Sequence, residues 1–272
     1  MFKKGCCIPG GSFMPQGVAS VETAYDIMKG GFDTALTHGY DFAEATVGLI
    51  MKLSPEELDR AVENHLTFDV ANSFIPPTLP ICHTMKNEPE KLEAYVDEAM
   101  RRMKLLGCSM VIFGSGAARR LPADLPREEA VALLDDFLRL CDRLAAKHGV
   151  TVALEPLNRD ETDFMNSVAE GYAIAKRLAL PNVKLLADAY HMAKEGESTD
   201  ILAKVQDILV HVHISEPDRA YPGKSEAGSA YLRAFRDALA ATSYRARVSV
   251  ECTFADFPAD SGAAFAFVKE TF

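Results

Sequence analysis

Short apolar segments alternate with longer amphipathic ones along the whole chain. The short segments are bounded by Gly, Pro or charged residues, which is typical of buried strands, and the longer ones repeat their apolar positions with helical spacing. We therefore expect eight strands separated by helices. The strands are expected at 2–8, 40–47, 67–74, 109–113, 150–154, 183–187, 210–214 and 247–250.

Helix signals follow the strands. Ser54-Pro55-Glu56-Glu57 combines an N-cap, a proline in the first turn and acidic residues where the helix dipole favours them. Gly149 is a natural stop for a long helix over 126–148. A proline-rich loop that includes His83 is expected before 89. Further helices are expected over 20–38, 89–106, 166–180 and 229–241, with short ones after 198 and at the end of the chain.

This order of elements predicts the fold class. Strands that alternate with helices, without a linker or a shift in composition, indicate right-handed βαβ units and a parallel sheet. Eight such units in 272 residues match a closed (β/α)8 barrel, or TIM barrel, and we expect one barrel domain over residues 1–272. An open doubly wound sheet is the alternative. It would need a phosphate-binding glycine turn, of which Gly10-Gly11 and Gly114-Ser115-Gly116 are incomplete versions.

Composition narrows the function and the cellular setting. A net charge of −10 argues against a nucleic-acid partner, which usually needs a basic face. No apolar stretch is long enough to span a membrane, and the start of the chain does not resemble a signal peptide. The six cysteines fit no zinc pattern and suit a reducing compartment. We expect a soluble, cytoplasmic protein.

The carboxyl ends of the later strands carry the candidate chemistry, because functional residues gather there in a barrel. Glu155, Asp188 and Glu251 each follow a strand directly, and His213 lies near the end of the seventh strand. Strand alternation puts all four on the inward face, opposite apolar residues that face the helices. His211 shares this face one layer deeper, as a supporting core residue. We expect the four residues at one level of the barrel mouth.

Three carboxylates and an imidazole at one level indicate a divalent cation, since each unpaired buried charge would cost several kcal/mol. An oxygen-rich set suits Mn²⁺, Mg²⁺ or Co²⁺ better than structural zinc. The alternative is a ring of carboxylates neutralised by Arg and Lys. Glu161, His191 and Arg219 lie close by in the sequence. From the residues alone, they are either loop side chains in solvent or part of the same site.

Four motifs together resemble a known family. They are Ala153-Leu154-Glu155-Pro156-Leu157-Asn158, Asp188-Ala189-Tyr190-His191, His211-Val212-His213-Ile214-Ser215-Glu216 with Arg219, and Ser249-Val250-Glu251. They resemble the xylose isomerase-like TIM-barrel superfamily, which includes sugar isomerases and epimerases and AP endonuclease family 2. Within it they are most similar to the ketose 3-epimerases of the tagatose and psicose type. The resemblance covers the second half of the chain and agrees with the strand count of the first.

The resemblance implies a role for each residue. Glu155, Asp188, His213 and Glu251 would bind one metal ion, with Mn²⁺ expected ahead of Mg²⁺ or Co²⁺. Glu155 and Glu251 would also be the catalytic acid/base pair, while Glu161, His191 and Arg219 would hold the oxygen atoms of a small-molecule sugar. The implied reaction is C3 epimerisation of a ketose. One glutamate removes a proton beside the carbonyl, the cation stabilises the enediolate, and the other glutamate returns a proton to the opposite face.

Several alternatives stay open. An aldose–ketose isomerase uses the same enediolate one carbon along, and inosose or dehydroshikimate dehydratases also begin with proton abstraction beside a carbonyl. An endonuclease IV-type enzyme would need further metal ligands, which are missing from Phe113-Gly114-Ser115-Gly116 and Asp218-Arg219-Ala220. A non-catalytic sugar-binding barrel ranks last because both glutamates are present.

The chain also departs from the epimerase pattern at the substrate end. The first strand reads Gly5-Cys6-Cys7-Ile8-Pro9, there is no Trp, and Tyr221-Pro222-Gly223-Lys224-Ser225-Glu226 replaces a glycine-rich turn. Because these segments would contact the far end of the substrate, they leave its identity open. The resemblance also implies a homo-oligomer, either a dimer or a tetramer.

Overall fold

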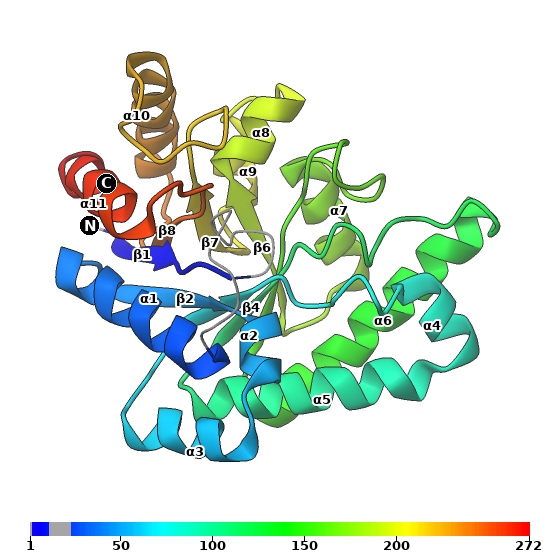
Figure 1. The fold of residues 1–272 in the computed structure, drawn as a ribbon. Helices are drawn as coiled ribbons and strands as arrows, with labels where there is room; N and C mark the ends of the chain where they lie inside the picture. The colour runs from blue at the N-terminus through cyan, green and yellow to red at the C-terminus, as the bar shows by residue number, and fades with distance from the viewer. Residues whose placement is uncertain (1, 11–22) are drawn as a thin grey trace.

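Eight parallel strands close into a barrel in sequence order, and the last strand pairs back with the first (Figure 1). The computed structural model describes residues 2–10 and 23–272. The predicted (β/α)8 barrel is confirmed, and the open doubly wound sheet is excluded. The strands are β1 (Lys3–Cys7), β2 (Phe42–Thr46), β3 (Val70–Asn72), β4 (Met110–Phe113), β5 (Thr151–Leu154), β6 (Val183–Asp188), β7 (Leu209–Ile214) and β8 (Arg247–Val250).

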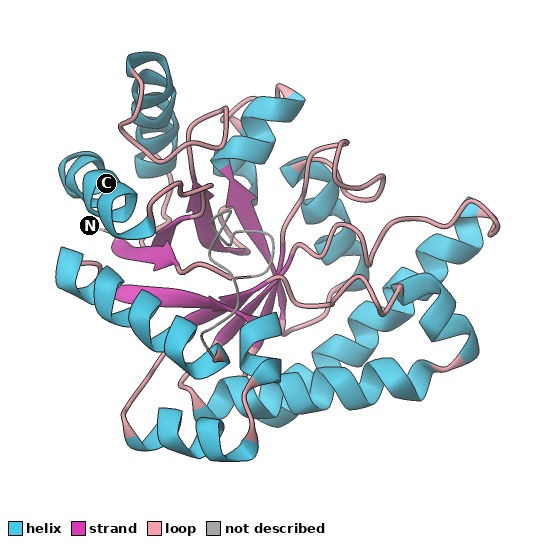
Figure 2. Ribbon diagram, in the orientation of Figure 1, coloured by secondary structure: helices cyan, strands magenta, loops and turns pink. Residues whose placement is uncertain are grey.

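Helices surround the barrel on its outside (Figure 2). The rings of Phe2 and Phe272 lie 6.5 Å apart, so the two ends of the chain meet beside β1. No helix among the described residues is long and apolar enough to cross a membrane. The helices are α1 (Ala24–His38), α2 (Val47–Lys52), α3 (Pro55–Glu63), α4 (Ile81–Asn87), α5 (Pro89–Leu105), α6 (Arg127–His148), α7 (Val168–Leu178), α8 (Ala189–Glu195), α9 (Ile201–Val205), α10 (Glu226–Ala240) and α11 (Phe257–Thr271).

The helix ends form where the sequence signals them. Ser54 and Glu57 make the expected reciprocal capping box at the start of α3. Gly149 ends α6 with a φ of 66°, a conformation that glycine adopts without steric cost. The expected start of the first helix at Ser20 lies outside the described residues. Within them, the Thr23 side chain caps α1.

Three short helices, α2, α4 and α8, differ from the expected pattern. The α2 helix begins directly at the end of β2 because the Thr46 hydroxyl accepts a hydrogen bond from Leu49 N. His83 lies on α4 rather than in a loop, and its Nε2 is 3.3 Å from Asp124 Oδ1.

The β3 strand is much shorter than the strand expected over 67–74. It ends at Asn72 because Ser73 takes a left-handed φ of 55°.

Two apolar layers support the barrel. Inside it, a small cluster fills the space below the mouth. Outside it, alternate strand residues such as Val152 and Val212 pack against the helices. A Cβ on Gly5 would lie 2.3 Å from the Phe42 ring, so only glycine leaves room for that ring inside the barrel. The inner cluster consists of Phe42, Val70, Met110, Ile112, Ala153 and Leu186.

Candidate metal centre and active site

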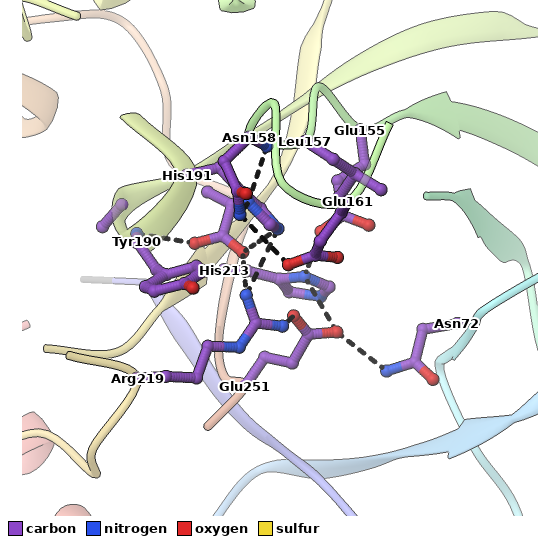
Figure 3. Close-up of polar contacts among 12 residues, drawn as sticks. Asn72, Glu155, Leu157, Asn158, Glu161, Tyr190, His191, His213, Arg219 and Glu251 are labelled. Carbon is purple, nitrogen blue, oxygen red and sulfur yellow. Dashed lines mark hydrogen bonds and ion pairs between the residues drawn. The ribbon is translucent and has the colours of Figure 1, made fainter. Parts of the chain in front are cut away.

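Four side chains converge at the mouth of the barrel, one from each of the last four strand ends. Glu155 follows β5, Asp188 ends β6, His213 lies on β7 and Glu251 follows β8. One ligand atom from each of them lies within 4.8 Å of the others, and each residue is at most 4% exposed. Figure 3 shows Glu155, His213 and Glu251 of this group close together, with Arg219 directed toward Glu251. The structure thus brings together the four residues that the sequence placed at one level.

His213 stands at the centre of this group. Its Nδ1 atom lies 3.0 Å from Glu155 Oε1 and 3.6 Å from Glu251 Oε1. Its other ring nitrogen, Nε2, lies 3.0 Å from Glu44 Oε1, on the far side of the ring. Although burial opposes a charge on the ring, the carboxylates of Glu251 and Glu44 raise the pKa of His213 well above its usual value. The imidazole therefore has Nδ1 among the carboxylates of the mouth and Nε2 against Glu44 in the barrel interior.

Asp188 provides the clearest indication that the group fits a cation. Its Oδ1 accepts a hydrogen bond from Tyr190 N over 2.7 Å. Its Oδ2 is buried and has no hydrogen-bond partner among the described residues, which costs free energy unless something else coordinates that oxygen. Three carboxylates and one imidazole nitrogen form a donor set that suits a divalent ion such as Mn²⁺. The residues present therefore fit a metal ion.

Burial also shifts the carboxyl groups of the site toward their protonated forms. It raises the pKa of Glu251 to about 7 and that of Asp188 to about 6. The pKa of Glu155 is raised as well, again chiefly by burial. Carboxyl groups with pKa values near neutrality both gain and lose protons readily, as acid/base catalysis requires.

Arg219 neutralises part of the negative charge. Its Nη2 donates to Glu251 Oε2 over 2.8 Å, and its guanidinium carbon lies 4.4 Å from the centre of the Tyr190 ring. The residue has a left-handed φ of 67° and donates its backbone N–H to Glu216 O over 2.8 Å. The neutralisation by arginine that the sequence offered as an alternative is therefore present at Glu251 and also near Asp188, whose Oδ2 lies 3.8 Å from Arg219 Nη1. It leaves Asp188 Oδ2 without a hydrogen bond.

His191 is a buried, neutral hydrogen-bond donor. Its Nδ1 accepts the backbone N–H of Asn158 over 3.1 Å, so the neutral ring carries its hydrogen on Nε2. Burial and the nearby Arg219 lower the pKa of His191 to about 2. His191 Nε2 lies 3.2 Å from Arg219 Nη1, and both atoms are donors. Asp188 Oδ2 lies 3.6 Å from His191 Nε2 and 3.8 Å from Arg219 Nη1, beyond hydrogen-bond distance of both donors.

Glu161 joins this group through Asn158, whose Nδ2 donates to Glu161 Oε1 over 3.1 Å. All three residues expected to contact substrate therefore lie beside the four expected metal ligands (Figure 3). His191 reaches this position from α8, a helix that the sequence pattern did not indicate.

Two residues on the preceding loop fix the position of Glu155. A Cβ on Gly114 would lie 2.2 Å from Glu155 Oε2, so the glycine leaves space for the carboxylate. Arg119 is wholly buried and donates from Nη1 to the backbone oxygens of Glu155 and Phe113, over 2.8 and 3.0 Å. Gly114 therefore leaves space for the Glu155 carboxylate, and Arg119 holds the backbone that carries it.

Sequence reasoning missed two residues of the site, Glu44 and Asn72. Asn72 ends β3, and its Nδ2 lies 3.4 Å from Glu251 Oε1 and 3.2 Å from Cys7 Sγ. Glu44 lies on β2 and contacts both His211 and His213. The signal was present for Glu44, because a single acid on the inward face of an apolar strand needs a partner.

Comparisons with known proteins identify the family of this chain. Residues 32–270 match the family described as "Xylose isomerase-like TIM barrel". An L-ribulose 3-epimerase from Methylomonas sp. (strain DH-1) is 30% identical over 224 residues, which span 78% of this chain and 74% of that enzyme. A 3-dehydro-D-guloside 4-epimerase from Escherichia coli (strain K12) is 32% identical over 120 residues, which span 44% of this chain and 45% of that enzyme.

The fold has close counterparts among solved structures. A crystal structure of D-allulose 3-epimerase from Methylomonas sp. in complex with D-allulose superposes with a TM-score of 0.81 at 21% identity. That alignment covers 100% of this chain and 97% of the other, so the two share one fold from end to end. The resemblance read from the four motifs is confirmed. This chain belongs to the xylose isomerase-like TIM barrel family.

Proposed function

We propose that the protein is a divalent-metal-dependent sugar epimerase that inverts a carbon next to a carbonyl, namely C3 of a ketose. The observation that carries this proposal is the pair of buried glutamates, Glu155 and Glu251, whose Oε1 atoms lie 3.0 and 3.6 Å from His213 Nδ1. Inversion requires a proton to leave one face of a carbon and another to arrive on the opposite face. Two carboxyl groups with raised pKa values suit that exchange.

The names of the relatives support the same chemistry. A ketose 3-epimerase acts beside a C2 carbonyl, and a 3-dehydro-guloside 4-epimerase acts beside a C3 carbonyl. Both reactions invert the carbon adjacent to the carbonyl. The match to the E. coli enzyme makes 4-epimerisation of a 3-dehydro glycoside the second candidate reaction for this chain.

We propose that Glu155, Asp188, His213 and Glu251 hold one cation, with Mn²⁺ preferred. When bound, the cation would polarise the substrate carbonyl and offset the negative charge that develops on its oxygen. Asp188 contributes the carboxylate oxygen that lacks a hydrogen bond. His213 contributes Nδ1, because Nε2 faces Glu44.

The remaining side chains orient the sugar and move protons. His191 Nε2 and Arg219 Nη1 lie 3.2 Å apart, close enough for both to donate to one substrate oxygen beside them. One glutamate, in its carboxylate form, accepts the proton from the carbon next to the carbonyl. The other, in its acid form, donates a proton to the opposite face, and the roles reverse in the other direction. The deep burial of the site limits competition from water.

A substrate panel tests this proposal. We would incubate the purified protein with ketohexoses, pentuloses, their phosphates, 3-dehydro glycosides and inososes, with Mn²⁺, with Mg²⁺, with Co²⁺ and with EDTA. Products would be identified by NMR. We expect epimer pairs that form with the cation and not with EDTA. An aldose product would instead indicate an aldose–ketose isomerase, loss of water would indicate a dehydratase, and turnover in EDTA would contradict the role of the metal.

We also propose, from the family resemblance, that the chain forms a homo-oligomer. Light scattering on the purified protein tests this directly, and a mass of one chain would contradict it.

A further inference from the structure

Glu44 is an acidic side chain inside the barrel, below the mouth. It lies in the middle of β2, where Cys7 of β1 and Val70 of β3 are its neighbours in register, and it is completely buried. Removing a carboxylate from water costs several kcal/mol unless hydrogen-bond donors replace the water. Its environment must therefore supply donors.

Two histidines of β7 supply them. Glu44 Oε2 lies 3.3 Å from His211 Nε2, and Glu44 Oε1 lies 3.0 Å from His213 Nε2. Both histidines are completely buried as well. In the closed barrel β8 and β1 separate β7 from β2, so these contacts cross the interior rather than joining neighbouring strands. Each carboxylate oxygen thus faces one ring nitrogen.

The contact with His213 has a direct consequence for its other nitrogen. A carboxylate only accepts hydrogen bonds, so Glu44 requires the hydrogen of a neutral His213 ring to be on Nε2. That leaves the lone pair of Nδ1 for the mouth, where Glu155, Asp188 and Glu251 gather. Partners of this kind commonly fix the tautomer and the ring orientation of a metal-binding histidine.

We propose that Glu44 is a positioning residue for the metal centre, which holds the His213 ring so that Nδ1 faces the cation. This inference rests on the proposed function, because it assigns Glu44 a task at the proposed cation site. His211 has a secondary part. His211 Nε2 faces the other oxygen of that carboxylate, Oε2, and so keeps the carboxylate from rotating away from His213.

A second metal ion bound by Glu44 is the rival explanation, since Cys7, Glu44 and His213 also offer three ligand atoms within 4.8 Å. The hydrogen bonds argue against it. Both oxygens of Glu44 are used by histidines, and Asn72 Nδ2 donates to Cys7 Sγ over 3.2 Å. Burial, and then the Glu44 carboxylate, raise the pKa of Cys7 well above its usual value, so the thiol keeps its proton.

Two substitutions test the proposal. Glu44→Gln keeps an acceptor oxygen but removes the charge, and Glu44→Met keeps the approximate size but removes every acceptor. We expect the Mn²⁺ affinity, measured by calorimetry, to fall by about 10- to 100-fold in Glu44→Gln and further in Glu44→Met. Circular dichroism melting would establish that each variant folds. If the Met variant does not fold, the Gln variant alone decides.

Glu216→Gln is the matched control. Glu216 is equally buried but binds Gly223 N, Ser225 N and the Ser225 hydroxyl, and it has no contact with the His213 ring among the described residues. We expect this variant to lose thermal stability without losing Mn²⁺ affinity. Glu44 variants that bind Mn²⁺ as tightly as the wild type would overturn the proposal.

A second measurement works without metal and separates this inference from the proposed function. Nitrogen-15 NMR of the histidine rings in the metal-free protein would show whether His213 Nε2 carries a hydrogen. In the metal-free wild type, where both ring nitrogens face carboxylates, we expect a hydrogen on each of them. In Glu44→Met we expect the Nε2 hydrogen to be lost, because Nε2 has no acceptor and the ring donates only from Nδ1. A Glu44→Met ring that keeps its Nε2 hydrogen would overturn the inference. A wild-type His213 without a hydrogen on Nε2 would overturn the inference, whereas a wild type that binds no Mn²⁺ would overturn the proposed function.

Discussion

Arg219 Nη2 donates a hydrogen bond to Glu251 Oε2 over 2.8 Å, so a residue expected to contact substrate also holds one of the two proposed acid/base groups. The guanidinium lies at the same time over the Tyr190 ring, at 4.4 Å. The planar shape of the Arg219 guanidinium and its positive charge therefore act in different ways. The planar guanidinium holds the Glu251 carboxylate in position through its hydrogen bond, and the charge stabilises the ionised form of Glu251.

These two uses predict different effects of two substitutions. Arg219→Gln removes the charge, so the pKa of Glu251 rises further and the limb of the pH–activity profile that reports it moves to higher pH. Arg219→Lys keeps the charge, so we expect that limb to stay in place. In both variants kcat/KM should fall by about 10- to 100-fold, the effect of losing about 1.5–3 kcal/mol from a charge-assisted hydrogen bond. A profile that moves equally in the two variants would contradict this account.

The two glutamates should be separable by isotope exchange. At saturating Mn²⁺, Glu155→Gln and Glu251→Gln should each lower epimerisation by about 10²- to 10⁴-fold. Each variant keeps one base, so in D₂O it should still exchange the C3 hydrogen of one epimer, and the two variants should favour opposite epimers. Glu226→Gln, on a side chain that is 91% exposed, is the control and should behave as the wild type. Full epimerase activity in either variant would contradict a two-base reaction.

Gly114→Ala tests the space beside Glu155. The added Cβ would lie 2.2 Å from Glu155 Oε2, and this oxygen, at the end of a flexible side chain, would move away. We expect the melting temperature to change little, whereas Mn²⁺ affinity and kcat both fall. The same substitution at Gly30, where a Cβ would meet nothing within 4 Å, is the control. A Gly114→Ala variant with normal Mn²⁺ affinity would show that the space beside Glu155 is not needed for metal binding.

Proton and metal should compete for the site. In the metal-free protein burial holds the pKa of Glu251 near 7 and that of Asp188 near 6, above the ordinary values of 4.5 and 3.8. The folded state therefore keeps protons that the unfolded chain has already lost, so the stability of the metal-free protein should fall as the pH rises from about 4 to about 7.

Mn²⁺ has to displace these protons, so its affinity should rise over the same interval, by about tenfold per pH unit for each proton displaced. Calorimetric titrations at a series of pH values, with thermal melts of the metal-free protein alongside, measure both trends. An affinity that does not change with pH would contradict the raised pKa values.

The sequence was sufficient to locate the outer part of the site. Glu155, Asp188 and Glu251 directly follow apolar strand residues, and a period of two determines which way they point. For Glu44, the inward position within an apolar strand signalled that the acid needs a partner, but it did not show which one, because the partners, His211 and His213, are across the barrel. The contact between Glu44 and the two β7 histidines depends on the closure of the barrel and on the register of its strands. The helix α8, which carries His191, has only seven residues, too few for a repeating apolar pattern to indicate a helix. Its N-cap is the Asp188 side chain, which the sequence suggested only as a metal ligand.

The most direct test of the central claim is the position at which solvent hydrogen enters a ketose substrate. The protein would be incubated in D₂O with Mn²⁺ and the ketose that it converts fastest, and the products would be examined by NMR. We predict one deuterium at C3 of the newly formed epimer. Deuterium at C1 or C2, or loss of water from the sugar, would contradict C3 epimerisation.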